Sequence, residues 1–177
     1  IIIRNIYLPT LLSSENIYSA ERKVVQDNNI KEKISSLDIF LQNVFRKKTF
    51  RPMQASSIIN SLRNIDSVVL LPTGAGKSFI YQLAGLLMPG ITLVVDPIIS
   101  LIEDQVEGLL SYGIDRAVPI SSGVEDLDNY LKGIERGEYL FIFHSPERLQ
   151  NPIFREKLRG LSQSSIINLA VIDEAHC

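Results

Sequence analysis

The sequence predicts an α/β fold, a three-layer sandwich in which helices cover both faces of a parallel sheet. Short runs that are apolar throughout recur from residue 68 onward, and stretches with helical spacing separate them. Such runs fit strands buried on both faces, which is typical of parallel sheets with crossover helices. The composition, 45% hydrophobic and 21% charged residues, suits one soluble globular domain with a substantial core.

Residues 1–44 precede the alternating pattern and are expected to form a helical N-terminal segment of unassigned role. Ser13 or Ser14 would cap a first helix with apolar residues on one face across 17–24. A second helix is expected across 34–45, where apolar residues recur at helical spacing.

The remaining elements follow from periodicity and turn residues. Pro52 suits the first residue of a helix, Pro89-Gly90 ends another, and Ser121 or Ser122 would cap a third. Pro119 lacks a backbone donor, which places its strand at the edge of the sheet or in a loop. Helices are expected at 52–62, 77–88, 99–110 and 151–160, and the helix capped by Ser121 or Ser122 would run through Leu127, Leu131 and Ile134. Strands are expected at 68–71, 91–95, 117–120, 139–143 and 169–172.

Charge and cysteine usage narrow the classes of function. The net charge is −2, so any nucleic-acid binding must use a local groove rather than bulk basic charge. Cys177 is the only cysteine, which excludes a disulfide framework or a cysteine-based zinc site within these residues and favours a reducing, cytoplasmic setting. No apolar run reaches the roughly 20 residues of a membrane span, so no membrane partner is expected. Because the chain begins at Ile1 and stops inside a motif, we expect it to be a piece of a longer protein.

The most informative segment is the glycine loop at 72–78, Pro-Thr-Gly-Ala-Gly-Lys-Ser, between a predicted strand and a predicted helix. Gly74 and Gly76 let the backbone curl close to phosphate oxygens, and the helix N-terminus favours negative charge. Lys77 would reach the β- and γ-phosphates, and the Ser78 hydroxyl would bind magnesium. An ordinary glycine turn is the alternative, which the flanking strand and helix disfavour.

An acidic pair follows the last predicted strand. Asp173 would hold magnesium through water, and Glu174 would orient and deprotonate the attacking water. Taken alone, the pair is equally well a polar strand end, but its position downstream of a phosphate loop favours nucleotide hydrolysis.

Six blocks in this order resemble the first motor domain of a RecQ-like DNA helicase of superfamily 2. The blocks lie at residues 50–54, 72–78, 81–82, 97–106, 145–149 and 173–177. The resemblance spans 45–177 and leaves 1–44 outside it. It implies a RecA-like P-loop NTPase domain, incomplete at its C-terminus, that works with a second RecA-like domain.

The resemblance also implies roles for individual residues. Gln54 would hydrogen-bond the adenine edge and Arg51 would pack on the base, although the same segment also reads as a capped helix start. Ser100 and Gln105 would contact the nucleic-acid backbone. The implied ATP-binding residues are Arg51, Gln54, Thr73, Gly74, Ala75, Gly76, Lys77 and Ser78; the implied magnesium ligands are Ser78 and Asp173; the implied catalytic residues are Lys77, Asp173, Glu174 and His176; and the implied nucleic-acid contacts are Ser100, Gln105 and Arg148.

Two of these roles keep an alternative. Arg148 would either touch phosphate or form an internal ion pair. His176 would couple the triphosphate site to motion of the partner domain, whereas an isolated histidine is more often just hydrogen-bonded in place.

Three positions depart from the family pattern. Leu71 stands where the general phosphate loop has its first glycine. Lys47 replaces an aromatic residue that stacks on adenine in many relatives. Asp96 replaces a small hydroxyl residue, and because a carboxylate facing a phosphate is unfavourable, Asp96 must point away or the strand must take another path.

The leading hypothesis is an ATP-dependent DNA helicase or translocase that uses Mg²⁺ and acts on single-stranded or forked DNA. An isolated first motor domain would be inactive or very slow, because the arginine finger of the second domain is worth roughly 10³–10⁵ in rate. Alternatives are an RNA helicase of the same superfamily and a nucleotide-gated nucleic-acid-binding scaffold without turnover. A small-molecule kinase fits less well, since its acidic site would not continue Ala-His-Cys.

Overall fold

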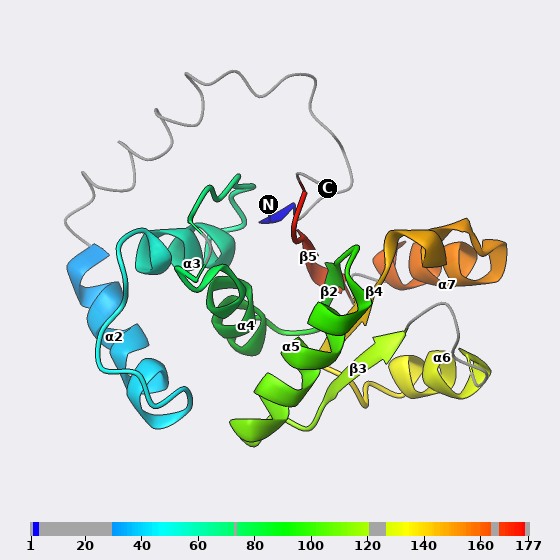
Figure 1. The fold of residues 1–177 in the computed structure, drawn as a ribbon, viewed down its shortest axis with the longest axis horizontal. Coiled ribbons are helices and arrows are strands. Elements are labelled where there is room, and N and C mark those ends of the chain that lie inside the picture. The colour runs from blue at the N-terminus through cyan, green and yellow to red at the C-terminus, as the bar shows by residue number, and fades with distance from the viewer. Residues whose placement is uncertain (1, 4–29, 73, 121–126, 164–166, 176–177) are drawn as a thin grey trace. The chain divides into compact units, whose positions relative to one another are not determined.

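A computed structural model describes residues 2–3, 30–72, 74–120, 127–163 and 167–175 (Figure 1). The chain divides into two compact units, Ile1–Leu87 and Met88–Cys177. Several predictions lie outside the described residues: the helix at 17–24, the caps at Ser121 and Ser122, and the roles of Thr73 and His176.

The first unit is built mainly from helices. Its elements are β1 (Ile2–Ile3), α2 (Ile30–Asn43), α3 (Gln54–Leu62) and α4 (Lys77–Leu87). The helices predicted at 34–45 and 77–88 are confirmed, and α4 ends before Pro89-Gly90 as expected.

Aromatic packing anchors the start of α4 in this unit. The Phe79 ring packs edge-on against the Phe45 ring, with 4.9 Å between the ring centroids. The Phe50 ring is tilted relative to the Phe79 ring, with 6.0 Å between their centroids. Phe45 and Phe79 are both buried, as is the face of α4 that continues through Ile80 and Leu83. Since α3 packs on α4, burial of these apolar side chains holds the start of α4 beside α3.

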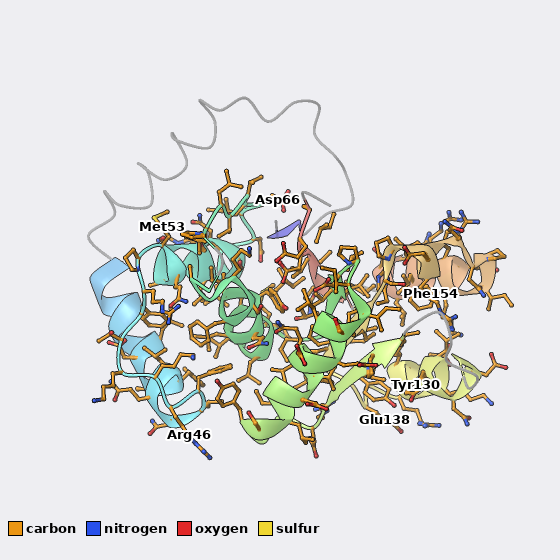
Figure 2. All side chains as sticks on the ribbon, viewed as in Figure 1. Arg46, Met53, Asp66, Tyr130, Glu138 and Phe154 are labelled. Carbon is orange, nitrogen blue, oxygen red and sulfur yellow. The ribbon has the colours of Figure 1, made fainter. Side chains whose placement is uncertain are left out.

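Two predictions in this unit are wrong in detail. The helix expected from Pro52 begins only at Gln54, because Met53, labelled in Figure 2, has φ of 69° and a left-handed conformation that cannot continue a helix. Residues 68–71 form no strand: a strand needs a ladder partner, these residues have none among the described strands, and the Leu70 side chain is 82% exposed.

The second unit is an α/β unit with four parallel strands. Their order in the sheet is β5 (Ile167–Ile172), β2 (Ile91–Val95), β4 (Phe141–His144) and β3 (Ala117–Ile120). The parallel sheet predicted from continuous apolar runs is confirmed. Pro119 lies in β3, which pairs only with β4 and is the edge strand that the proline predicted. In chain order the elements are β2 (Ile91–Val95), α5 (Ile99–Ser111), β3 (Ala117–Ile120), α6 (Leu127–Glu135), β4 (Phe141–His144), η1 (Pro146–Gln150), α7 (Pro152–Gln163) and β5 (Ile167–Ile172).

Helices cover both faces of this sheet. One face joins Leu93, Ile142 and their neighbours to Leu131 of α6 and Phe154 of α7 in a single apolar cluster. α5 contacts β3 and β4 but contributes no residue to that cluster, so it covers the opposite face. This is the three-layer α/β arrangement expected from the sequence. Among the described residues, no helix has the length and apolar character needed to cross a bilayer.

Candidate nucleotide and nucleic-acid sites

The glycine loop runs directly into the first turn of α4. Gly74 and Gly76 have φ of 76° and 82°, in the left-handed region that glycine adopts without strain. The Ala75 N–H donates to the Pro72 carbonyl at 3.1 Å and closes the turn. Lys77 is the first residue of α4, and no acidic residue lies in the first turn to oppose an anion there.

Gln54 ties this loop to the start of α3. Its amide Nε2 donates to the carbonyls of Ala75 and Gly76 at 3.0 and 3.2 Å, while its Oε1 accepts the N–H of Arg51 at 2.9 Å. The side chain is only 3% exposed. A Cβ at Gly76 would lie 2.6 Å from Nε2, so any residue larger than glycine would require the Gln54 amide to shift.

Arg51 completes the contact by donating from Nη1 to the Gly74 carbonyl. Three successive carbonyls of the loop, those of Gly74, Ala75 and Gly76, therefore face Arg51 and Gln54. Because the C=O and N–H of a trans peptide point in opposite directions, the N–H groups of Gly76 and Lys77 point away from Gln54. Such adjacent, similarly directed N–H groups are what an anion-binding nest requires.

The two residues predicted to hold adenine thus lie against the loop backbone. Their sequence positions, more than 20 residues upstream, do not reveal this contact. Their predicted contact with the base stays a prediction. Lys47, which departs from the family pattern, has its Nζ 5.7 Å from the centroid of the Phe79 ring.

The acidic pair lies immediately beyond β5, at the C-terminal end of the parallel sheet as predicted. The Asp173 N–H donates to the Val95 carbonyl at 2.9 Å, and its Oδ1 accepts the Glu174 N–H at 3.0 Å. Glu174 has φ of 46°, a left-handed turn residue. Both side chains are half-buried.

Asp96 leaves β2 at the same end of the sheet. Its side chain is 1% exposed, and its Oδ1 accepts the Ile98 N–H at 2.9 Å. Burial raises the pKa of this carboxyl, and the charges of Asp173 and Glu174 raise it further, while the Ile98 N–H works in the opposite direction. The sequence left two alternatives for Asp96: a carboxylate that points away from the phosphate, or a different path of the strand. The strand β2 has the predicted bounds, and the Asp96 carboxylate turns inward to the backbone of Ile98.

The predicted nucleic-acid contacts occupy different surroundings. Ser100 is exposed in the first turn of α5, and Gln105 is half-buried on the same helix. Arg148 is only 8% exposed, with its Cζ 5.9 Å from the Phe154 ring centroid (Phe154 is labelled in Figure 2). Packing over an aromatic ring is therefore an observed role of Arg148, added to the two that the sequence left open.

The predicted magnesium ligands Ser78 and Asp173 belong to different units, and their shared role stays a prediction. In the part of the chain that the structure describes, no three His, Cys, Asp or Glu side chains gather as a metal site.

Comparison with known proteins decides the family. The DEAD/DEAH box helicases match this chain over residues 51–177, from Arg51 at the start of the Gln54 turn to the end of the acidic motif. The chain belongs to the DEAD/DEAH box helicase family. The RecQ-like resemblance is confirmed by relatives within that family.

Among these helicase relatives, the probable ATP-dependent DNA helicase RecS of Bacillus subtilis is 39% identical, over 81% of this chain and 28% of its own length. The ATP-dependent DNA helicase Q-like 4B of Arabidopsis thaliana is 37% identical over 80% of this chain and 13% of its own length. The ATP-dependent DNA helicase Q5 of Mus musculus is 35% identical over 77% of this chain and 14% of its own length. The chain thus spans less than a third of these curated relatives.

The role of Asp96 could have been predicted from the Asp96-Pro97 pair in the sequence. Asp followed by Pro, with the Asp three residues before the first residue of a helix, is typical of a side chain that accepts a hydrogen bond from the backbone two residues on. At Asp96 this pattern identifies the turn into α5.

Proposed function

We propose that this chain is the ATP-binding motor domain of a DNA helicase, which binds Mg-ATP and couples its hydrolysis to movement along single-stranded DNA. The observation that carries the proposal is the glycine loop at the N-terminus of α4, with its carbonyls held by Arg51 and Gln54. Membership of a helicase family supports the same conclusion.

The loop and the first turn of α4 supply the groups that a triphosphate needs. The N–H groups of Gly76 and Lys77 would donate to phosphate oxygens, and the Lys77 ammonium would neutralise the β- and γ-phosphates. The Ser78 hydroxyl would bind the magnesium ion, which supplies charge neutralisation to the phosphoryl group when bound. Thr73 and Ala75 would complete the cradle.

The acidic pair supplies the groups for hydrolysis. Asp173 would hold magnesium through a water molecule, and Glu174 would take the proton of the attacking water. Arg51 and Gln54 would also contact adenine, and His176 would report the state of the nucleotide to a second RecA-like domain.

The first turn of α5 would contact the DNA backbone. Ser100 is exposed there, so its hydroxyl and the helix N-terminus can donate to phosphate without reading sequence. Gln105 and Arg148 are assigned to the same function by resemblance. A soluble protein of the cytoplasm or nucleoid fits this activity.

Two variants of the full-length protein test the proposal. Lys77→Ala should abolish DNA-stimulated ATP hydrolysis together with ATP binding, and Glu174→Gln should keep ATP binding but lose at least about 100-fold in kcat. Matched controls are Lys132→Ala on α6 and Glu156→Gln on α7, both exposed residues of the same charge. Normal DNA-stimulated turnover in either test variant would refute the assignment.

An RNA helicase is the second candidate, because the phosphate loop and acidic pair serve both classes. Competition between single-stranded DNA and RNA for stimulation of the ATPase decides between them. Turnover by this chain alone should fall roughly 10³–10⁵-fold below that of the full-length protein if a second domain supplies an arginine finger.

A further inference from the structure

The end of β2 connects two segments with proposed functions. Val95 is in register with Ile172 of β5 on one side and with His144 of β4 on the other. Just beyond these pairs, the Asp173 N–H donates to the Val95 carbonyl at 2.9 Å, and the Asp96 N–H donates to the His144 carbonyl at 3.0 Å. Since neighbouring strands lie roughly 4.7–4.9 Å apart, Asp96 and Asp173 leave the sheet as adjacent residues.

The side chain of Asp96 continues this connection toward α5. Its Oδ1 accepts the N–H of Ile98, the residue that caps α5, and Ile98 provides no side-chain cap of its own. With a 1% exposed side chain, Asp96 has no freedom to leave this position without opening the turn. The direction in which Ile98 and the exposed Ser100 enter the helix is therefore set by the Asp96 carboxylate.

A neutral hydroxyl side chain can also accept the hydrogen bond of a turn of this kind. A carboxylate is the harder group to bury, and here it lies near the negative charges of Asp173 and Glu174. The carboxylate is placed between the acidic pair and the first turn of α5.

We propose that Asp96 is a positioning residue that couples nucleic-acid binding at the first turn of α5 to the acidic pair beyond β5. A phosphate contact at Ser100 moves the first turn of α5, and the hydrogen bond from Ile98 carries that movement to Asp96. The backbone of Asp96 follows Val95, whose carbonyl holds Asp173. The inference rests on the proposed function, and it assigns to this chain its own route for regulation of ATP hydrolysis by nucleic acid.

Three substitutions in the full-length protein separate the hydrogen bond from the charge. Asp96→Ala removes the acceptor, Asp96→Asn keeps an Oδ1 acceptor without the charge, and Asp96→Ser offers a weaker hydroxyl acceptor. For each variant, kcat and the KM for ATP are measured without DNA and with saturating single-stranded DNA. Asp115→Ala, at an exposed acidic residue before β3, is the matched control.

We expect Asp96→Ala to reduce the ratio of DNA-stimulated to unstimulated kcat by about fivefold or more, the lower range of coupling between sites. Asp96→Asn should restore most of this ratio, Asp96→Ser should be intermediate, and Asp115→Ala should equal the wild type. Amide hydrogen exchange across residues 98–100 should be faster in Asp96→Ala than in Asp96→Asn. A variant that merely lowered stability would reduce both rates by the same factor and leave the ratio unchanged.

Three results would overturn the inference. An unchanged ratio in Asp96→Ala removes the coupling role, and equal losses in Asp96→Ala and Asp96→Asn show that charge rather than the hydrogen bond matters. If Asp96→Ala fails to fold, Asp96→Ser and Asp96→Asn are compared with the wild type. Equal ratios in these three proteins, together with unchanged exchange at 98–100, refute the inference. Absence of any DNA stimulation in the wild type defeats the proposed function itself, whereas a stimulated wild type with an unaffected Asp96→Ala defeats only the coupling.

Discussion

Replacement of Gly76 by alanine tests the contact between Gln54 and the glycine loop. Two penalties add at this position. A left-handed backbone costs a residue with a Cβ about 1–2 kcal/mol, and Gly76 has φ of 82°. The new Cβ would also lie 2.6 Å from the Gln54 Nε2, nearer than carbon and nitrogen can approach without displacement.

Relief of that overlap requires the Gln54 amide to move. The amide then loses its hydrogen bonds to the carbonyls of Ala75 and Gly76, each worth about 0.5–1.5 kcal/mol. The total expected loss of unfolding free energy is therefore about 2–5 kcal/mol for Gly76→Ala. Gly74→Ala provides the matched control, because Gly74 has φ of 76° but no atom within 4 Å of its added Cβ, and it should lose only about 1–2 kcal/mol.

The assay is urea-induced unfolding of the wild type and the two alanine variants, followed by far-ultraviolet circular dichroism. A third comparison introduces Gly76→Ala into a Gln54→Ala background, where the overlap is absent and the extra penalty should disappear. Equal destabilisation by Gly74→Ala and Gly76→Ala would refute the reasoning. So would a Gly76→Ala penalty that is the same with and without the Gln54 side chain.

Three further predictions concern other parts of the chain. Burial lowers the pKa of His144 from its ordinary 6.5, so the unfolded chain binds more protons than the folded chain below that pH. The free energy of unfolding should therefore fall as pH decreases from 6.5, by at most about 1.4 kcal/mol per pH unit. Between pH 7.5 and 5.5 the urea midpoint should fall less in His144→Gln than in the wild type, and an identical fall would contradict the assignment. Phe154→Ala should destabilise by about 3–5 kcal/mol in urea unfolding, because this fully buried ring packs against His144 at 5.3 Å and belongs to the main apolar cluster, and a loss under 1 kcal/mol would exclude that packing. Leu70→Ser should change thermal stability by no more than about 0.5 kcal/mol, since the side chain is 82% exposed, whereas a large loss would indicate the buried strand that the sequence predicted.

Local patterns were sufficient for most of the elements and for the family. The strand at 91–95 is confirmed to the residue, α4 ends where Pro89-Gly90 predicted, and Pro119 lies on an edge strand. These features depend on neighbours in the sequence, because periodicity and turn residues act within one element. The glycine loop and the acidic pair likewise carry their chemistry in adjacent residues, so the helicase family was predictable from the motifs.

Tertiary structure decided the partners of individual groups. Val68 and its neighbours are as apolar as any strand of the sheet, yet they have no ladder partner among the strands that the structure describes. A residue's own side chain does not reveal which backbone it pairs with. Tertiary structure likewise decides the contacts of Gln54, whose amide donates to carbonyls more than 20 residues away. It also places the Asp96 carboxylate at a helix start, where the charges of the acidic pair raise its pKa. The sequence by itself determined which chemical groups this protein has and on which elements they lie; only packing between distant segments determined what each group touches, because hydrogen bonds and charges act through space rather than along the chain.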